Sequence, residues 1–327
     1  MKCGRDLRVA LVGSGLIGSG WAVHLLCHGV NQIILQDISE QALERAKKLV
    51  LQGLDFMMEN GAITGQQKQK YLDDLQYTTN LEQAVQEADF ILENGPENLE
   101  VKQSILSKIE AVCREDAIIT SSTSGIMIGE IAKNALHPER VIGAHPYHPV
   151  YLLPLVEIVT GPKTQDGYLD RALSFFRSVG KKPVVLKKDS PGYIGSRLMV
   201  TLFRESVSMV MNGVCTLEDL DTAFTYGPGM RYALMGPYLV YQLTGGERGF
   251  QGTMCGPMGQ SSEAWLQSLC NWDHWPDEAK EFFKNGAPKE ICQIMDQRVP
   301  GTGRTNDELV SFRDKGLLEL LKYHQLI

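Results

Sequence analysis

The chain has 327 residues, about twice the length of a typical domain of roughly 150 residues, so one large or two smaller domains are expected. Its 32 basic and 39 acidic residues give a net charge of −7, which argues against nucleic acid or an anionic membrane as the main partner. An apolar fraction of 43% with 22% charged residues is typical of a chain that buries a sizeable core. The composition therefore predicts a globular protein.

Targeting and metal-binding signals are missing from the sequence. No run approaches the roughly 18 consecutive apolar residues that indicate a membrane-spanning helix. The start of the chain leads directly into a strand-like run and a glycine loop, which argues against a cleavable signal. The seven cysteines form no CxxC pair, and their odd number suits reduced thiols better than disulfides or a zinc site. We expect a soluble cytoplasmic protein without a metal site.

Short β-branched runs alternate with amphipathic stretches over residues 1–190. Strands are predicted at residues 7–12, 32–36, 90–93, 117–121, 140–145, 153–160 and 182–186. Helices are predicted between the early strands at residues 16–28, 40–60 and 99–113. This alternation predicts an α/β fold with a mainly parallel sheet that is covered by helices on both faces.

The pattern changes near residue 189, beyond which few β-rich runs occur. Helices are predicted there at residues 193–212, 217–224, 232–244, 262–271, 288–297 and 306–324. Ser190 and Pro191 suit the N-cap and the first position of a long helix. We therefore predict an α/β domain over residues 1–188 and an all-α domain over residues 189–327.

A glycine-rich loop follows the first predicted strand and opens the first predicted helix. In a GxGxxG loop the glycines permit a tight turn, close approach of the backbone to a diphosphate, and close packing of helix on strand. The unpaired amides and the dipole of the helix N-terminus then hold the diphosphate. The expected cofactor-binding residues of this loop are Gly13, Ser14, Gly15, Leu16, Ile17 and Gly18.

A carboxylate, Asp37, ends the second predicted strand, about 20 residues beyond the loop, as the dinucleotide-binding pattern requires. A carboxylate there accepts a hydrogen bond from the ribose 2′-hydroxyl and repels a 2′-phosphate. No basic residue follows Asp37 before Arg45. The sequence therefore predicts NAD rather than NADP as the cofactor. The alternative is a glycine turn that only connects two elements.

A histidine and a glutamate lie on two successive predicted strands. His145 is at the carboxyl end of its strand, where open α/β sheets bind ligands, and Glu157 lies in an apolar strand, where an unpartnered carboxylate is costly to bury. Alcohol oxidation needs a base for the hydroxyl proton, and histidine, with an ordinary pKa of about 6.5, is suited to that task. A carboxylate would fix its tautomer. Taken alone, a His–Glu pair is more often a structural hydrogen bond.

Five segments together resemble the L-3-hydroxyacyl-CoA dehydrogenase superfamily. They are the glycine loop and residues 96–102, 121–124, 145–157 and 189–193. Their order and spacing match the family over nearly the whole chain. The resemblance implies a Rossmann-type domain, a helical domain that forms a homodimer, and NAD-dependent oxidation of a 3-hydroxy acid.

The resemblance also implies roles for individual residues. His145 would be the base, Glu157 would orient it, and Ser124 would hydrogen-bond the substrate oxygen. Glu97 and Lys102 would lie by the cofactor. Without the resemblance, a helix cap is the favoured interpretation of Ser124, and a solvated helix start explains Glu97 and Lys102 equally well.

Two stretches, residues 150–157 and 229–237, resemble the L-carnitine dehydrogenase and L-gulonate 3-dehydrogenase/λ-crystallin branches, and residues 238–246 resemble the carnitine branch. Both branches oxidise a 3-hydroxy acid with a free carboxylate. We therefore expect Arg231 to grip that carboxylate bidentately; a surface arginine is the alternative interpretation. Aromatic residues of the second domain are a weaker indication of a quaternary ammonium site.

Two positions depart from the family pattern. His148 stands where the relatives typically have asparagine, and Ser196 stands where they have asparagine or, in the carnitine branch, aspartate. The resemblance implies that both positions touch nicotinamide or substrate, and His148 is also a rival base. The acid itself stays open: carnitine-like, gulonate-like or an acyl-CoA thioester. A crystallin-like structural protein or an NAD-binding sensor is the alternative that is not an enzyme.

Overall fold

The computed structural model describes residues 7–326, which form two compact units. The first unit extends to Ser196 and regains the segment from Leu317 onward, whereas the second spans Arg197–Gly316. The C-terminal segment belongs to the first unit because Leu318 and Leu321 are buried in its core. The expected boundary at residue 188 thus lies before the point at which the compact units divide.

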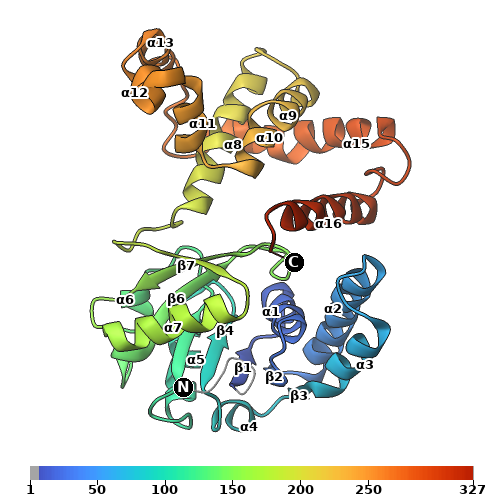
Figure 1. The fold of residues 1–327 in the computed structure, drawn as a ribbon, viewed down its shortest axis with the longest axis vertical. Helices are drawn as coiled ribbons and strands as arrows, with labels where there is room; N and C mark the ends of the chain where they lie inside the picture. Colours follow the sequence, from blue (N-terminus) through green and yellow to red (C-terminus); the bar gives the residue numbers. More distant parts are fainter. Residues whose placement is uncertain (1–6, 327) are drawn as a thin grey trace. The chain divides into compact units, whose positions relative to one another are not determined.

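The strands of the first unit form one sheet, as Figure 1 shows. They are β1 (Arg8–Val12), β2 (Gln32–Gln36), β3 (Leu75–Thr78), β4 (Phe90–Glu93), β5 (Ile118–Ser121), β6 (Val141–Pro146), β7 (Leu155–Thr160) and β8 (Lys182–Val185). Their spatial order is β3-β2-β1-β4-β5-β6-β7-β8. Neighbouring strands are parallel except β6 and β7, which are antiparallel. The prediction of a mainly parallel α/β sheet is confirmed.

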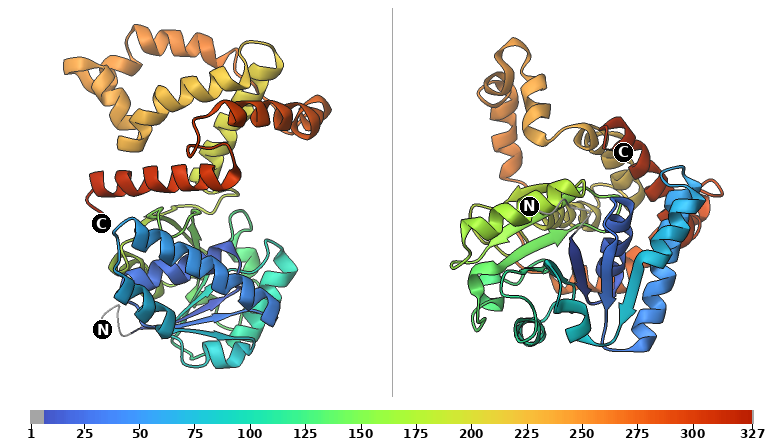
Figure 2. Two further views of the ribbon diagram at one scale, coloured as in Figure 1. Left: turned by 90° about the vertical axis from the view of Figure 1, so that its right-hand side faces the viewer. Right: turned by 60° about the horizontal axis from the view of Figure 1, so that its bottom comes forward.

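Helices cover both faces of this sheet, as the views in Figure 2 also show. They are α1 (Leu16–Cys27), α2 (Glu40–Glu59), α3 (Gly65–Asp74), α4 (Leu81–Val85), α5 (Leu99–Glu110), α6 (Ile128–Ile131) and α7 (Asp166–Ser178), with a short 3-10 helix at Pro138–Arg140. Val9 and Leu11 of β1 join one core cluster with α1, α2 and α7. Ala10 and Val12 join the other with α4, α5 and α6. Because successive side chains of a strand point to opposite faces, β1 contributes residues to a core on each face of the sheet.

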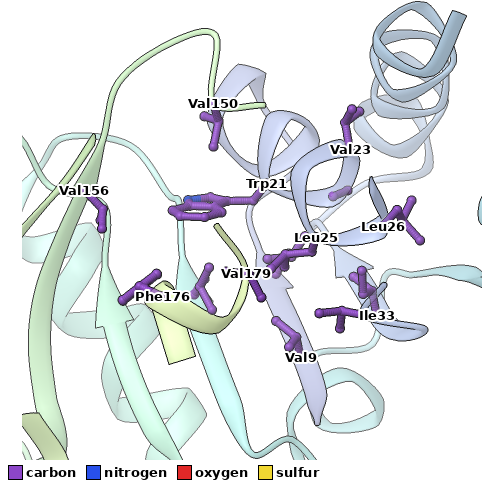
Figure 3. Packing of buried hydrophobic residues seen from close by; sticks show 14 of the residues in the cluster. Val9, Trp21, Val23, Leu25, Leu26, Ile33, Val150, Val156, Phe176 and Val179 are labelled. Carbon is purple, nitrogen blue, oxygen red and sulfur yellow. The ribbon is translucent and has the colours of Figure 1, made fainter. Parts of the chain in front are cut away.

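The larger core fixes α1 against the sheet. Trp21 of α1 is fully buried, and its ring centroid lies 5.7 Å from that of Phe176 on α7. Figure 3 shows the Trp21 ring between Val150 and Phe176 in this core. The position of α1 matters because the glycine loop leads into its first turn.

Three elements between residues 60 and 90 were not predicted from the sequence: α3, β3 and α4. β3 has four residues, of which only Leu75 is buried, so it lacks an apolar pattern. The start of α3 carries a signal that the sequence does contain, a capping box between Thr64 and Gln67.

The expectation that Ser190 and Pro191 begin a long helix is wrong. The helix α8 (Gly195–Met211) begins later, and the Tyr193 amide donates to the Ser190 carbonyl in a turn. Gly192 and Tyr193 have φ values of +73° and +46°, a left-handed backbone that a right-handed helix excludes. The first amides of α8 find their acceptor elsewhere, on a buried carboxylate described below.

The second unit is helical, as predicted. Its helices, apart from the parts of α8 and α16 (Asn306–Tyr323) that it contains, are α9 (Leu217–Tyr226), α10 (Pro228–Leu234), α11 (Pro237–Thr244), α12 (Gly249–Met254), α13 (Pro257–Leu266), α14 (Asp277–Glu281) and α15 (Ala287–Gln297), with short 3-10 and π turns at Gly246–Arg248 and Phe282–Gly286. The single helix predicted over 232–244 is two, because Pro237 starts α11 and Met235 is extended. No helix within residues 7–326 is long and apolar enough to cross a membrane.

A lysine is buried beneath α1. Lys181 is 2% exposed, its Nζ donates to the carbonyls of Val150 and Leu153, and it lies 4.8 Å from the centre of the Trp21 ring. Burial lowers the pKa of Lys181 to about 7. In an unfolded chain the pKa of lysine is about 10.4. Between these values the unfolded chain therefore holds a proton that the folded protein has released.

This difference predicts that the protein becomes more stable as pH rises from 7.5 to 9. The free energy of unfolding should increase by about 1.4 kcal/mol per pH unit, and Lys181→Met should lose that slope. The range ends near 9 because burial raises the pKa of Cys27 to about 12. Above the ordinary pKa of a thiol, the unfolded chain has lost a proton that the folded protein keeps, so the free energy of unfolding falls as pH rises. Urea denaturation followed by circular dichroism measures both proteins, and parallel pH dependences would contradict the prediction.

Candidate active site

The glycine loop forms a cradle at the N-terminus of α1. Gly13 has a φ of +97°, and a Cβ added to it would lie 2.7 Å from the Asn94 carbonyl oxygen. A Cβ on Gly18 would lie 1.9 Å from the Gly13 carbonyl oxygen. Gly15, the N-cap of α1, has no atom within 4 Å of such a Cβ. The outer glycines are thus needed for packing, and the middle one leaves the helix N-terminus open for a diphosphate.

A cleft of about 870 Å³ lies at the carboxyl ends of β1 and β4. These strands are neighbours, and the helices that follow them, α1 and α5, cover opposite faces of the sheet. The cleft therefore lies at the topological switch point, where open α/β sheets bind dinucleotides. Gly13, Ser14 and Gly15 line it, whereas Leu16 is exposed and Ile17 packs against the core.

Asp37 lines the same cleft, at the end of β2. Its Oδ2 accepts from the amide of Ser14 at 2.8 Å and from the Ser14 hydroxyl at 2.7 Å. Its Oδ1 accepts from the Ile38 amide at 2.7 Å. These donors hold the carboxylate at the cleft, where a ribose can reach it. Lys108 of α5 also lines the cleft, a position that the sequence did not predict because α5 is distant from Asp37 along the chain.

Lys102 is buried below the loop that follows β4. Its Nζ lies 3.1 and 3.0 Å from the two carboxylate oxygens of Glu93 and 3.2 Å from the carbonyl oxygen of Gly95. Both charged side chains are at most 3% exposed. A solvated helix start is therefore wrong for Lys102. It does not line the cleft itself, but it ties down the loop that does.

Glu97 organises the next loop of the site. Its Oε1 accepts from the Thr123 hydroxyl at 2.6 Å and from the amides of Ser124 and Gly125 at 3.0 Å. Burial opposes ionisation of Glu97, but these hydrogen bonds and the Lys102 charge outweigh it and lower the pKa. Glu97 thus fixes the segment that carries Ser124.

Ser124 has an exposed side chain, and it does not cap the helix that follows. The N-cap of α6 is Met127, which provides no side-chain cap. The amide of Ile128 instead donates to Asp189 Oδ2 at 3.0 Å. The helix-cap interpretation of Ser124 is therefore wrong.

His145 and Glu157 lie directly opposite each other on β6 and β7. The distance from His145 Nδ1 to Glu157 Oε2 is 2.9 Å, and the two residues are 9% and 1% exposed. Glu157 Oε1 accepts from the amides of Ile194 and Gly195 at 2.9 and 3.0 Å. Because a carboxylate only accepts hydrogen bonds, Nδ1 carries the proton that is donated to Glu157, and Nε2 is the ring nitrogen left for another partner.

Two tyrosines that the sequence analysis missed flank His145. The ring centroids of Tyr147 and Tyr193 lie 4.9 and 5.5 Å from that of His145. Tyr147 follows the last residue of β6, so strand alternation did not indicate its position beside His145. The position of Tyr193 depends on the left-handed turn before α8, which the sequence did not reveal.

The expected substrate-binding residues are distributed over both units. His148 is exposed in the loop after β6. Ser196 hydrogen-bonds the Tyr147 hydroxyl through its backbone and side chain. Arg231 is exposed on α10 of the second unit. Within residues 7–326 no group of three side chains is arranged to hold a metal ion.

Comparisons with known proteins place this geometry in a family. Residues 8–190 match the NAD binding domain of 3-hydroxyacyl-CoA dehydrogenase, and residues 192–285 match its C-terminal domain. The chain belongs to the 3-hydroxyacyl-CoA dehydrogenase family. It is an NAD-dependent oxidoreductase, and the open cradle and Asp37 fit that cofactor.

Individual relatives of this 3-hydroxyacyl-CoA dehydrogenase family member cover most of its length. L-carnitine dehydrogenase of Staphylococcus epidermidis is 42% identical over 75% of this chain and 75% of its own length. L-carnitine dehydrogenase of Pseudomonas putida is 34% identical over 96% of this chain and 92% of its own. A 5-formyl-3-hydroxy-2-methylpyridine 4-carboxylic acid 5-dehydrogenase, an NAD⁺-dependent dismutase, has a similar structure, with a TM-score of 0.75 at 26% identity over 98% of this chain and 97% of that one. The (S)-3-hydroxybutyryl-CoA dehydrogenase of Ralstonia eutropha has a TM-score of 0.64 at 27% identity, covering 73% and 83%.

The position of Asp37 predicts the effect of removing its charge. Asp37→Ala should reduce the preference for NAD over NADP about tenfold or more, since it removes a charge-assisted acceptor for the 2′-hydroxyl and the repulsion of a 2′-phosphate. The measurement is the ratio of kcat/KM for the two cofactors in both proteins. An unchanged ratio would mean that Asp37 does not reach the ribose.

Proposed function

We propose that the protein oxidises the 3-hydroxyl of a small L-3-hydroxy acid to the 3-oxo acid, with a carnitine-like acid as the first candidate and a gulonate-like acid as the second. The observation that carries this choice is the similarity to L-carnitine dehydrogenases over as much as 96% of the chain. The substrate of those relatives carries a free carboxylate. The substrate here is a related free acid, because His148 and Ser196 depart from the pattern of that branch.

The base in this reaction is His145. NAD, when bound, supplies the acceptor for the hydride that leaves the substrate carbon. His145 Nε2 takes the hydroxyl proton, while Nδ1–H remains hydrogen-bonded to Glu157 Oε2 at an Nδ1–Oε2 distance of 2.9 Å. The imidazolium that forms is then stabilised by a buried carboxylate. Ser124, on the loop held by Glu97, hydrogen-bonds the substrate oxygen.

The remaining roles follow from the same proposal. Glu97, in the loop after β4, and Lys102, in α5, support the cofactor, and the glycine loop and Asp37 bind it directly. His148 and Ser196 touch the substrate or nicotinamide, and Arg231 grips the carboxylate. The division of labour is a cofactor domain over residues 1–188 and a substrate and dimerisation domain over residues 189–327.

We also propose that the protein is a cytoplasmic homodimer. The second unit exposes large apolar side chains on one stretch of α8, and these favour burial against a second copy. Four of them are between 45% and 62% exposed: Leu198, Met199, Leu202 and Phe203. The odd number of cysteines and the missing CxxC pairs are typical of a reducing compartment.

A short-chain L-3-hydroxyacyl-CoA dehydrogenase is the second candidate. It is favoured by the structural similarity to the (S)-3-hydroxybutyryl-CoA dehydrogenase of Ralstonia eutropha. A CoA thioester would require a basic exit for the phosphates, so free CoA should then raise the melting temperature of the protein.

A substrate panel tests the proposed function. Purified protein with NAD should form NADH with L-carnitine, L-gulonate or a related free acid, and not with L-3-hydroxybutyryl-CoA, because the proposed site grips a carboxylate. L-3-hydroxybutyrate, which has the carboxylate but no further polar group, is the matched control. Turnover of the thioester alone would contradict the free acid and leave the assignment of the base untouched.

The base itself is tested by substitution. His145→Ala should bind NADH with an unchanged Kd and lose turnover by about three orders of magnitude, since general base catalysis is worth roughly 10²–10⁴-fold. Fluorescence titration measures the affinity and NADH absorbance measures the rate. Retained turnover would contradict the assignment and would point to His148 as the base.

A further inference from the structure

The buried carboxylate of Glu157 has more donors than a pair with His145 requires. Its Oε1 accepts from two backbone amides at the start of α8. Its Oε2 accepts from His145 Nδ1 at 2.9 Å and also from the hydroxyl of Tyr147 at 3.4 Å. Tyr147 and His145 thus donate to the same oxygen atom.

The Tyr147 hydroxyl lies so close to Gly195 that no residue with a Cβ fits at that position without a shift of the tyrosine. A Cβ added to Gly195 would lie 1.9 Å from the hydroxyl oxygen and 2.6 Å from the ring carbon that bears it. Ser196 hydrogen-bonds the same hydroxyl through its backbone and its side chain. A glycine, a small serine and a carboxylate oxygen therefore surround the hydroxyl and direct it to Glu157.

We propose that Tyr147 is a positioning residue that acts through Glu157 to set the pH range over which His145 serves as the base. The inference rests on the proposed function for its catalytic consequence. Two donors on one carboxylate oxygen share its electron density, so each receives a weaker hydrogen bond than it would alone. A Glu157 carboxylate that also accepts from Tyr147 stabilises the His145 imidazolium less than a carboxylate that accepts from His145 alone. The neutral form of His145, which is the base, is therefore available at lower pH.

The other groups around His145 do not take this role. Titratable side chains in contact with His145 include Glu157 of β7, Tyr147 of the loop after β6 and Tyr193 of the turn before α8. Burial raises the pKa of Tyr193, and the negative charges of Asp189, Glu97 and Glu157 raise it further. Burial also raises the pKa of Tyr147. Both tyrosines are therefore neutral at working pH, and Tyr147 is the one with a hydrogen bond to Glu157.

Tyr147→Phe tests the inference, because it removes the hydroxyl and keeps the ring. The acid limb of kcat/KM for oxidation should move to higher pH by about half a unit, since a normal hydrogen bond to a charged group is worth about one to two pH units and 3.4 Å is long. The plateau rate should stay within about twofold. Tyr168→Phe, which removes a hydroxyl from α7, is the matched control and should leave the limb in place.

A titration without substrate separates the inference from the proposed function. In protein with isotope-labelled histidine, assigned with His145→Gln, the midpoint of the His145 chemical-shift titration should move upward in Tyr147→Phe. Ser196→Ala, which removes one hydrogen bond from the hydroxyl, should move it in the same direction by less, and it replaces Tyr147→Phe if that variant does not fold.

Each outcome decides one of the two statements. A lower plateau without a shift of the limb or of the midpoint would mean that Tyr147 only supports the structure, and the inference would be wrong. A shift to lower pH would overturn it as well. A shifted midpoint in a protein that oxidises no 3-hydroxy acid would overturn the proposed function and leave the coupling of Tyr147 to His145 intact.

Discussion

The hydrogen bonds of one buried carboxylate connect the chemistry of this protein to its fold. Glu157, inside β7, holds His145 of β6 with one oxygen and the first amides of α8 with the other. The amides at a helix N-terminus need an acceptor, and a buried carboxylate needs donors. Each group therefore satisfies the other. The left-handed turn at Gly192 and Tyr193 follows from this arrangement, because it aims the amides of Ile194 and Gly195 at the sheet instead of continuing a helix from Ser190.

A second buried carboxylate has a similar role on the cofactor side. Glu93 ends β4, as Asp37 follows β2, and it accepts from Lys102, from the Ser121 hydroxyl and from the amide of Gly95. The loop that closes the cleft is thus held from below by charge-assisted hydrogen bonds in a region of low dielectric. In both halves of the site, acids at or near the strand ends are used to fix loops. The flexible part of a Rossmann-type site is therefore anchored without any disulfide among the described residues.

Strand alternation and the glycine loop made most of the α/β unit predictable from the sequence. The predicted strands correspond to β1, β2 and β4 to β8, because β1, β2 and β4 to β7 bury recognisable apolar runs and the edge strand β8 carries a short apolar run that stays largely exposed. β3 was missed because only Leu75 of its four residues is buried, so the strand has little apolar surface that the sequence could show. The start of α8 was misplaced because its cap comes from β7, far away in the sequence. The role of Lys102 beneath the cofactor loop and the hydroxyl of Tyr147 depend on tertiary contacts, which no local pattern encodes.

The antiparallel pairing of β6 and β7 has a consequence for how this scaffold can change. In a parallel pair, a base and its orienting acid would be separated by a crossover helix, and any insertion there could shift one against the other. Here a single hairpin holds both, and the ladder fixes His145 opposite Glu157 whatever the connecting segment contains. Within residues 147–154, the exposed His148 can therefore change without disturbing this pairing, whereas Val150 and Leu152 are held in the core. Such an arrangement lets exposed positions of the connecting segment vary while His145 and Glu157 stay in register.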